Sequence, residues 1–286
     1  MTTTPTTRAT TGPATVRAGG AAARTAFIGL LSRDLTVLRK SIKEFLPRTL
    51  LQPLLLMFVF TYVFPKIGQG VGGGSAAGEA AASAFATVLV AGVVGLSVFF
   101  QGVQAVALPL VQEFGYTKEI EDRVLAPIPV ALVAIEKVTA GAIQCLFAAS
   151  LVFPLASFVP ATPVNLSIHW PLLITLAPLA CLVASALGLS FGTFFEPRSV
   201  PVLFGVVILP ITFLGCTYYS WSSLESIRWL QILVLVNPLV YISEGFRAAL
   251  TDSPHMPLWA IYSAQVVFLA LFLRVGIRNF RKRVLS

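Results

Sequence analysis

Residues 138–195 read VTAGAIQCLFAASLVFPLASFVPATPVNLSIHWPLLITLAPLACLVASALGLSFGTFF and contain no Asp, Glu, Lys or Arg. Three further runs, 49–65, 80–112 and 199–224, are also free of these residues. A charge at the centre of a spanning helix costs about 2.5–3.5 kcal/mol on insertion scales, so multi-span proteins keep such runs uncharged. The pattern predicts an all-α integral membrane protein whose charged groups lie between its spans.

The overall composition agrees with this class. Hydrophobic residues make up 56% of the chain and charged residues only 11%, whereas soluble domains are about 25% charged. The net charge of +8 is what Lys and Arg in cytoplasmic loops produce, so no nucleic-acid partner is expected. The three cysteines are far apart and lie in or beside apolar runs, which predicts neither a disulfide nor a metal site: Cys145, Cys181 and Cys216.

Six uncharged runs are long enough to cross about 30 Å of hydrocarbon. They are expected at about 47–65, 84–110, 138–159, 171–195, 200–219 and 257–277. A seventh run, 229–242, is too short to cross and is broken by Asn237-Pro238, so a re-entrant segment is expected at about 221–250. In the fourth span, the small residues Ala184, Gly188 and Gly192 predict close contact with another helix.

Charge placement supports six spans with both termini in the cytoplasm. Of the 20 Lys and Arg residues, this topology leaves only Lys66, Arg228 and Arg247 outside. Residues 1–25 are rich in Thr, Ala, Gly and Arg and are expected to form a disordered cytoplasmic tail without a signal peptide. Residues 26–286 would form the transmembrane domain.

Two cytoplasmic segments have patterned polar faces. Apolar residues recur at helical spacing through 27–46 and leave a basic face, which predicts an amphipathic interfacial helix with Arg33, Arg39, Lys40 and Lys43. This helix either only anchors the chain to anionic lipid or also touches a cytoplasmic subunit. Residues 113–126 hold most of the cytoplasmic acids, and they form either a docking helix ended by Pro127 or a solvated loop.

The segment before the last span combines interfacial aromatic residues with a sharp break. Trp229-Leu230-Gln231 is followed by Asn237-Pro238, where proline removes a helix hydrogen bond. Glu244 and Arg247 are three residues apart and can pair on one helix face.

In these features the chain resembles the permease subunit of type-2 ABC exporters. This family includes drug-efflux permeases of the daunorubicin-resistance kind, nodulation-factor exporters and polysaccharide or teichoic-acid exporters. The basic helix before the first span, the acidic loop with Glu113, Glu119, Leu125 and Pro129, and the segment from Trp229 through Asn237-Pro238 to Arg247 match in order, over roughly residues 26–283.

The resemblance implies that separate chains bind ATP and form the path through the membrane. The sequence has no phosphate-binding Gly-x-x-x-x-Gly-Lys-Ser/Thr motif, so ATP and Mg would be bound and hydrolysed by separate ABC ATPase subunits. Two permeases, identical or paralogous, would enclose the path through the lipid. Residues 113–126 would be the coupling helix in an ATPase cleft, flanked by the 27–46 helix. The contacts would come from Glu113, Phe114, Tyr116, Lys118, Glu119, Glu121, Asp122 and Arg123.

The expected function is therefore export of a drug-like, lipid or glycolipid and polysaccharide cargo across the cytoplasmic membrane. A proton-coupled secondary transporter would require an ionisable group inside a span, and a membrane enzyme would require clustered acids or histidines; a membrane scaffold is a further alternative. Gln101 and Gln104 share a helix face in the second span. They either bond neighbouring helices or line the substrate path.

Overall fold

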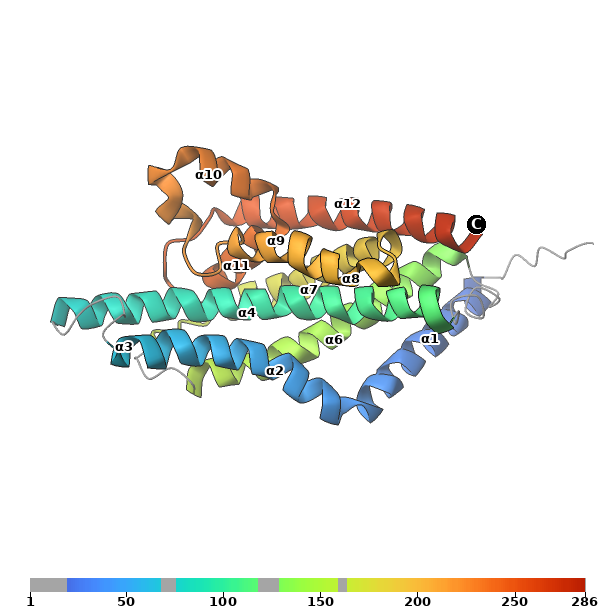
Figure 1. The fold of residues 1–286 in the computed structure, drawn as a ribbon, viewed down its shortest axis with the longest axis horizontal. Helices are drawn as coiled ribbons and strands as arrows, with labels where there is room; N and C mark the ends of the chain where they lie inside the picture. Colours follow the sequence, from blue (N-terminus) through green and yellow to red (C-terminus); the bar gives the residue numbers. More distant parts are fainter. Residues whose placement is uncertain (1–19, 68–75, 118–128, 159–163, 286) are drawn as a thin grey trace, which may run out of the picture.

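The computed structural model describes residues 20–67, 76–117, 129–158 and 164–285, and this part of the chain contains helices and no strand (Figure 1). The long helices are α1 (Gly20–Lys40), α2 (Ile42–Phe58), α4 (Ala76–Gln112), α6 (Val130–Phe158), α7 (Trp170–Phe194) and α12 (Leu258–Leu285). The predicted tail lies outside the described residues up to position 19.

Shorter helical elements join and extend these helices. The π-helical turn η1 (Val59–Val63) and α3 (Phe64–Lys66) continue α2, and η2 (Glu113–Thr117) continues α4. After α7 come η3 (Pro197–Ser199), α8 (Val200–Val202), η4 (Leu203–Ile208) and α9 (Leu209–Phe213). Then follow η5 (Trp221–Ser226), α10 (Arg228–Leu233), η6 (Val234–Val236) and α11 (Pro238–Leu250).

Five helices of the described chain are long and apolar enough to span a membrane. They are Ile42–Val63, Ala81–Gly115, Val130–Pro154, Trp170–Phe194 and Leu258–Val284. The pair Arg228–Val236 and Pro238–Leu250 is bent by 99° between its two helices, as a re-entrant segment or a broken span would be. These helices confirm an all-α, multi-pass membrane protein with a bent segment before its last span.

The centre of the bundle is the contact between α4 and α7, with α11, α6 and α12 packed around it. The small residues of α7 permit this contact. A Cβ on Gly188 would lie 2.7 Å from the carbonyl oxygen of Val103, and one on Gly192 would lie 2.9 Å from Leu110 Cβ. The close approach expected from the small-residue spacing in α7 is therefore confirmed.

Gly188→Ala should destabilise the protein by about 1–3 kcal/mol, because the added methyl group would force two backbones apart. The expected result is a lower midpoint of thermal unfolding in detergent. Gly205→Ala is the matched control, because a Cβ at Gly205 meets nothing within 4 Å. Equal midpoints for the two variants would contradict the tight α4–α7 contact.

The fifth predicted span differs from the helix that the structure shows. A span was expected over 200–219, but the helix ends at Phe213. The chain then turns through Cys216, whose φ of 51° lies in the left-handed region, and side chains of later segments bond the freed backbone. Asn237 Nδ2 donates to the Ile211 carbonyl at 2.6 Å, which satisfies a polar group near the end of an apolar helix.

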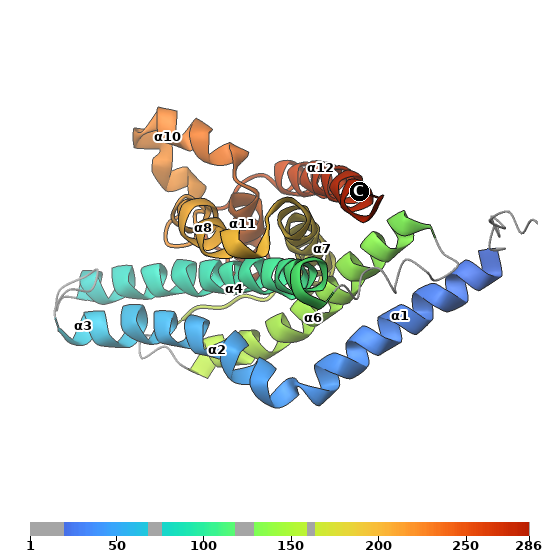
Figure 2. The same cartoon turned by 45° about the vertical axis from the view of Figure 1, so that its right-hand side comes forward.

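The predicted interfacial helix also divides differently. Residues 27–46 were expected to form one helix, but α1 ends at Lys40 and α2 begins at Ile42. At the break, Ser41 Oγ donates to the carbonyl of Val37 at 3.0 Å. In both views α1 leaves this elbow and runs beside α6 (Figure 2).

Two ends of the bundle can be distinguished in Figure 1. The C-terminal part of α12, the end of α7 and η2 meet at one end, which we call the basic end because it holds Arg278, Arg281, Lys282 and Arg283. The loops around α10 and α11 form the opposite end, where the described basic residues are Lys66, Arg228 and the buried Arg247.

Candidate functional site

The predicted coupling segment begins with a buried ion pair rather than with an exposed acid. Glu113 in η2 accepts a hydrogen bond from Lys137 Nζ of α6 at 2.7 Å, and both side chains are buried. Lys137 Nζ also donates to Asp34 Oδ2 of α1 at 3.2 Å. The three charges join α1, α6 and the end of α4, so Glu113 has an internal partner in addition to any ATPase contact.

Phe114 connects the same segment to the last helix. Its ring lies 5.5 Å from the ring of the buried Phe280, and the guanidinium carbon of Arg283 lies 4.7 Å from its centroid. Arg283 Nη1 also donates to the carbonyl of Phe195 at 3.1 Å, and more weakly to Thr193 and Gly192 at 3.3 and 3.4 Å. A cation there complements the negative end of the α7 dipole. Segment 113–117, α7 and α12 thus meet at one guanidinium.

The other predicted coupling residues are only partly visible. Lys118, Glu119, Glu121, Asp122 and Arg123 lie outside the described residues. Tyr116 has a described backbone, in η2, and its side chain is outside the description. The docking helix over 113–126 therefore stays a prediction beyond Thr117.

The basic residues of the predicted interfacial helix stay on the surface. Arg33, Arg39 and Lys40 of α1 and Lys43 of α2 are exposed. Their arrangement permits contact with anionic headgroups or with another subunit. Asp34, on the inner side of α1, was not identified from the sequence, because its partner Lys137 is 103 residues away.

At the opposite end, Glu244 and Arg247 pair as their spacing suggested, but deep inside the protein. Both side chains are fully buried on α11. Arg247 Nη2 donates to the Cys216 carbonyl at 2.9 Å and to that of Tyr219 at 3.3 Å. Glu244 accepts from the backbone N–H of Trp221 and of Met256, each at 2.8 Å. Arg247 was counted among the outside residues of the re-entrant segment, and the structure shows that it is buried there, where the pair holds two loops against α11.

Asn237 and Pro238 form the start of α11. Asn237 Oδ1 accepts from the N–H of Leu239 at 2.9 Å, which caps the helix. Pro238 occupies the first helical position, where its missing N–H costs no hydrogen bond. The dipeptide therefore both turns the chain and starts the buried helix, as a re-entrant turn requires.

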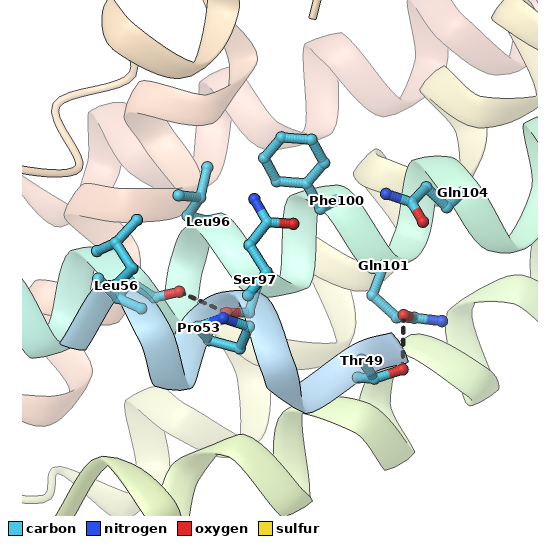
Figure 3. Close-up of a pocket in the computed structure, with 10 residues that line it drawn as sticks. Thr49, Pro53, Leu56, Leu96, Ser97, Phe100, Gln101 and Gln104 are labelled. Carbon is cyan, nitrogen blue, oxygen red and sulfur yellow. Dashed lines mark hydrogen bonds between the residues drawn. The ribbon is translucent and has the colours of Figure 1, made fainter. Parts of the chain in front are cut away.

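A polar cleft runs along α4 from the basic end. Figure 3 shows Gln101 and Gln104 on α4, with the Gln101 carbonyl oxygen accepting from Thr49 of α2 at 3.1 Å. The cleft continues as a cavity of about 310 Å³ lined by both helices and by Gln144 of α6. A second cavity of about 310 Å³ reaches Asp34, Glu113 and Lys137. The sequence identified Gln101 and Gln104 but not the cleft between helices.

Comparison with known proteins agrees with this architecture. Residues 25–251 match the family model described as ABC-2 type transporter. The inner membrane transport permease YadH of Escherichia coli K12 is 29% identical over 157 residues, which cover 55% of this chain and 60% of that protein. YadH of Shigella flexneri matches with the same values. The matched region thus spans less than two thirds of these relatives, whereas the family model covers most of the chain. The chain therefore belongs to the ABC-2 type transporter family.

Proposed function

We propose that the chain is the membrane-spanning permease subunit of an ATP-driven ABC exporter. The observation that carries the proposal is the position of segment 113–117, which leaves the bundle at the basic end and is tied there to four helices. Lys137 connects it to α6 and α1, and Arg283 connects it to α7 and α12. Because these contacts join the segment to the bundle, a partner bound to it can move several helices together.

The family membership supports the rest of the assembly. ATP and Mg would be held by separate ABC ATPase subunits, and a second permease, identical or paralogous, would complete the path. The basic end would face the cytoplasm, because Lys and Arg collect on that side of a membrane. With this orientation both termini would lie in the cytoplasm, in a multi-pass protein of the cytoplasmic membrane. The cargo class would be an amphipathic drug-like molecule, a lipid or a glycolipid or polysaccharide.

Proton-coupled transport is the alternative function, because it requires a buried group that can exchange a proton. Glu244 is the fully buried carboxylate of α11, but it accepts hydrogen bonds from Arg247, Trp221 and Met256. These three donors occupy the carboxylate and hold it in place. The side chain therefore fits a structural role better than the exchange of a proton.

Charge reversal in the coupling segment tests the proposed function. Glu119→Lys with Glu121→Lys should leave membrane insertion intact, because the helices that span the membrane are untouched. The double variant should lose co-purified ATPase, or should lose stimulation of ATP hydrolysis by cargo, in a reconstituted complex. Loss of one partner of a buried, hydrogen-bonded charge pair at a subunit interface costs about 2–5 kcal/mol of binding free energy.

Glu225→Lys with Asp252→Lys is the matched control, because both acids are exposed at the opposite end. This control should keep ATPase binding and stimulation. Wild-type behaviour of the Glu119 and Glu121 variant in both assays would overturn the coupling role of the segment.

A further inference from the structure

The cleft along α4 has an unusual composition for the interior of a membrane protein. Its uncharged polar side chains come from three helices and from the elbow at Ser41. They are Ser41, Thr49, Gln101, Gln104, Gln112 and Gln144. Amides at membrane depth are costly unless they bond to a polar partner. Thr49 bonds the side-chain oxygen of Gln101 across two helices, and the cavity of about 310 Å³ beside these amides has room for a molecule that exchanges hydrogen bonds with them.

The cleft lies where a molecule dissolved in the bilayer could enter it laterally. Its walls are α2 and α6, and both present exposed apolar side chains to the surroundings, including Leu51 and Leu55 on α2 and Leu146 on α6. Phe45 and Phe147 meet across the two walls with ring centroids 6.3 Å apart. From Gln112 to Gln101 the floor on α4 extends about 16 Å at 1.5 Å per residue. The polar track therefore reaches from the basic end to about the middle of the membrane.

Charge in the cleft is largely balanced. The adjoining cavity holds Asp34 and Glu113, but Lys137 bonds both of them. Among the described side chains that line the amide-lined part, the one charged group is the exposed Glu44. A glutamine amide donates and accepts hydrogen bonds, as a hydroxyl group does. This lining suits a neutral head with several hydroxyl groups better than a phosphate or an ammonium group.

We propose that this cleft binds the uncharged, hydroxyl-bearing head of an amphipathic molecule, while the apolar tail of that molecule stays between α2 and α6 in the lipid. The inference rests on the proposed export function and names the head group that the same path would accept. Gln104 and Gln144, on facing helices, contact the head (Figure 3 shows Gln104). Ala105 lies on the floor that the two cavities share.

The proposal can be tested by photo-affinity labelling of the permease–ATPase complex in lipid nanodiscs, with no ATP added. The probes share one alkyl chain with a diazirine next to the head group, and they carry a maltose, phosphocholine or sulfate head. We expect saturable labelling by the maltoside at peptides from α2, α4 and α6 that line the cleft, and about tenfold less by the two charged probes. Equal labelling by all three heads would overturn the proposal.

Variants separate the site from general insertion into lipid. Gln104→Leu with Gln144→Leu removes two neutral hydrogen-bonding groups and should weaken maltoside labelling about tenfold. Gln231→Leu, the matched control on α10, should leave it unchanged. Ala105→Phe keeps the amides but fills the cavity floor, and it should abolish cleft labelling. Unchanged labelling in folded Gln104→Leu/Gln144→Leu or Ala105→Phe protein would contradict the site.

The outcome is distinguishable from failure of the export function. ATPase association is measured on the same preparations. If no ATPase associates with the permease but the maltoside probe still labels the cleft selectively, the head-group site is supported and the exporter assembly is refuted. If the ATPase associates normally but the three probes label the cleft equally, the exporter assembly is supported and the head-group site is refuted.

Discussion

Arg247→Met should reduce folded protein more than any other single change considered for this chain. Arg247 and Glu244 are both fully buried, and removal of one partner of a buried pair costs about 3–5 kcal/mol because the other charge is left without compensation. The variant also removes the donor to the carbonyls of Cys216 and Tyr219. We expect little monodisperse protein after detergent extraction and a lower thermal midpoint.

A double variant identifies the cause of this loss. Glu244→Gln combined with Arg247→Met removes the buried carboxylate as well, so it should be less destabilised than Arg247→Met alone. Arg228→Met is the matched control, because Arg228 is exposed on α10. A thermal midpoint for Arg247→Met equal to that of Arg228→Met would show that the pair contributes nothing to folding.

Lys137→Met should cause the second largest effect, about 3 kcal/mol of destabilisation, because it leaves the buried Glu113 without its ammonium partner. It should also free α1, since Lys137 holds Asp34. Trypsin should then cleave at the exposed Arg33, Arg39 and Lys40 faster than in the wild-type protein. The rate of cleavage and the thermal midpoint are the two measurements.

Glu113→Gln together with Lys137→Met should recover part of the stability but not the protection of α1. The first effect follows because the double variant no longer buries the Glu113 carboxylate, and the second because the contact between Lys137 and Asp34 is still missing. Lys282→Met, at an exposed position of the same end, should change neither measurement. Unaltered cleavage of α1 in Lys137→Met would mean that the contact with Asp34 does not hold α1 in place.

Local patterns were sufficient to predict most of the secondary structure. Charge-free runs marked the greater part of each long helix because the cost of a buried charge acts on each span separately. The expectation that charged groups lie only between spans was wrong for Val130–Pro154, which includes the buried Glu136 and Lys137. Asn237-Pro238 marked the bend before the last span, since proline acts on the backbone next to it. The small residues of α7 marked its closest contact for the same local reason.

Features that depend on distant segments were not predictable in the same way. The spacing of Glu244 and Arg247 indicates a pair, but its burial depends on Cys216, Trp221 and Met256, which come from separate loops. Lys137 and Arg283 read as ordinary basic residues near helix ends, and only the fold shows that they join helices. The early end of the fifth helix depends on the left-handed backbone at Cys216, and glycine at position 215 was its one sequence signal.

The short fifth helix has a consequence for the surrounding bilayer. Residues 200–213 rise only about 21 Å at 1.5 Å per residue, whereas the hydrocarbon layer is about 30 Å thick. The five long helices, of 22 to 35 residues, are all long enough to cross that thickness, so the shortfall in length falls on one side of the protein. Either the bilayer becomes thinner next to α8 and α9, or the bend at Cys216 lies below the level of the headgroups. The lipid annulus of this permease is therefore uneven around its circumference.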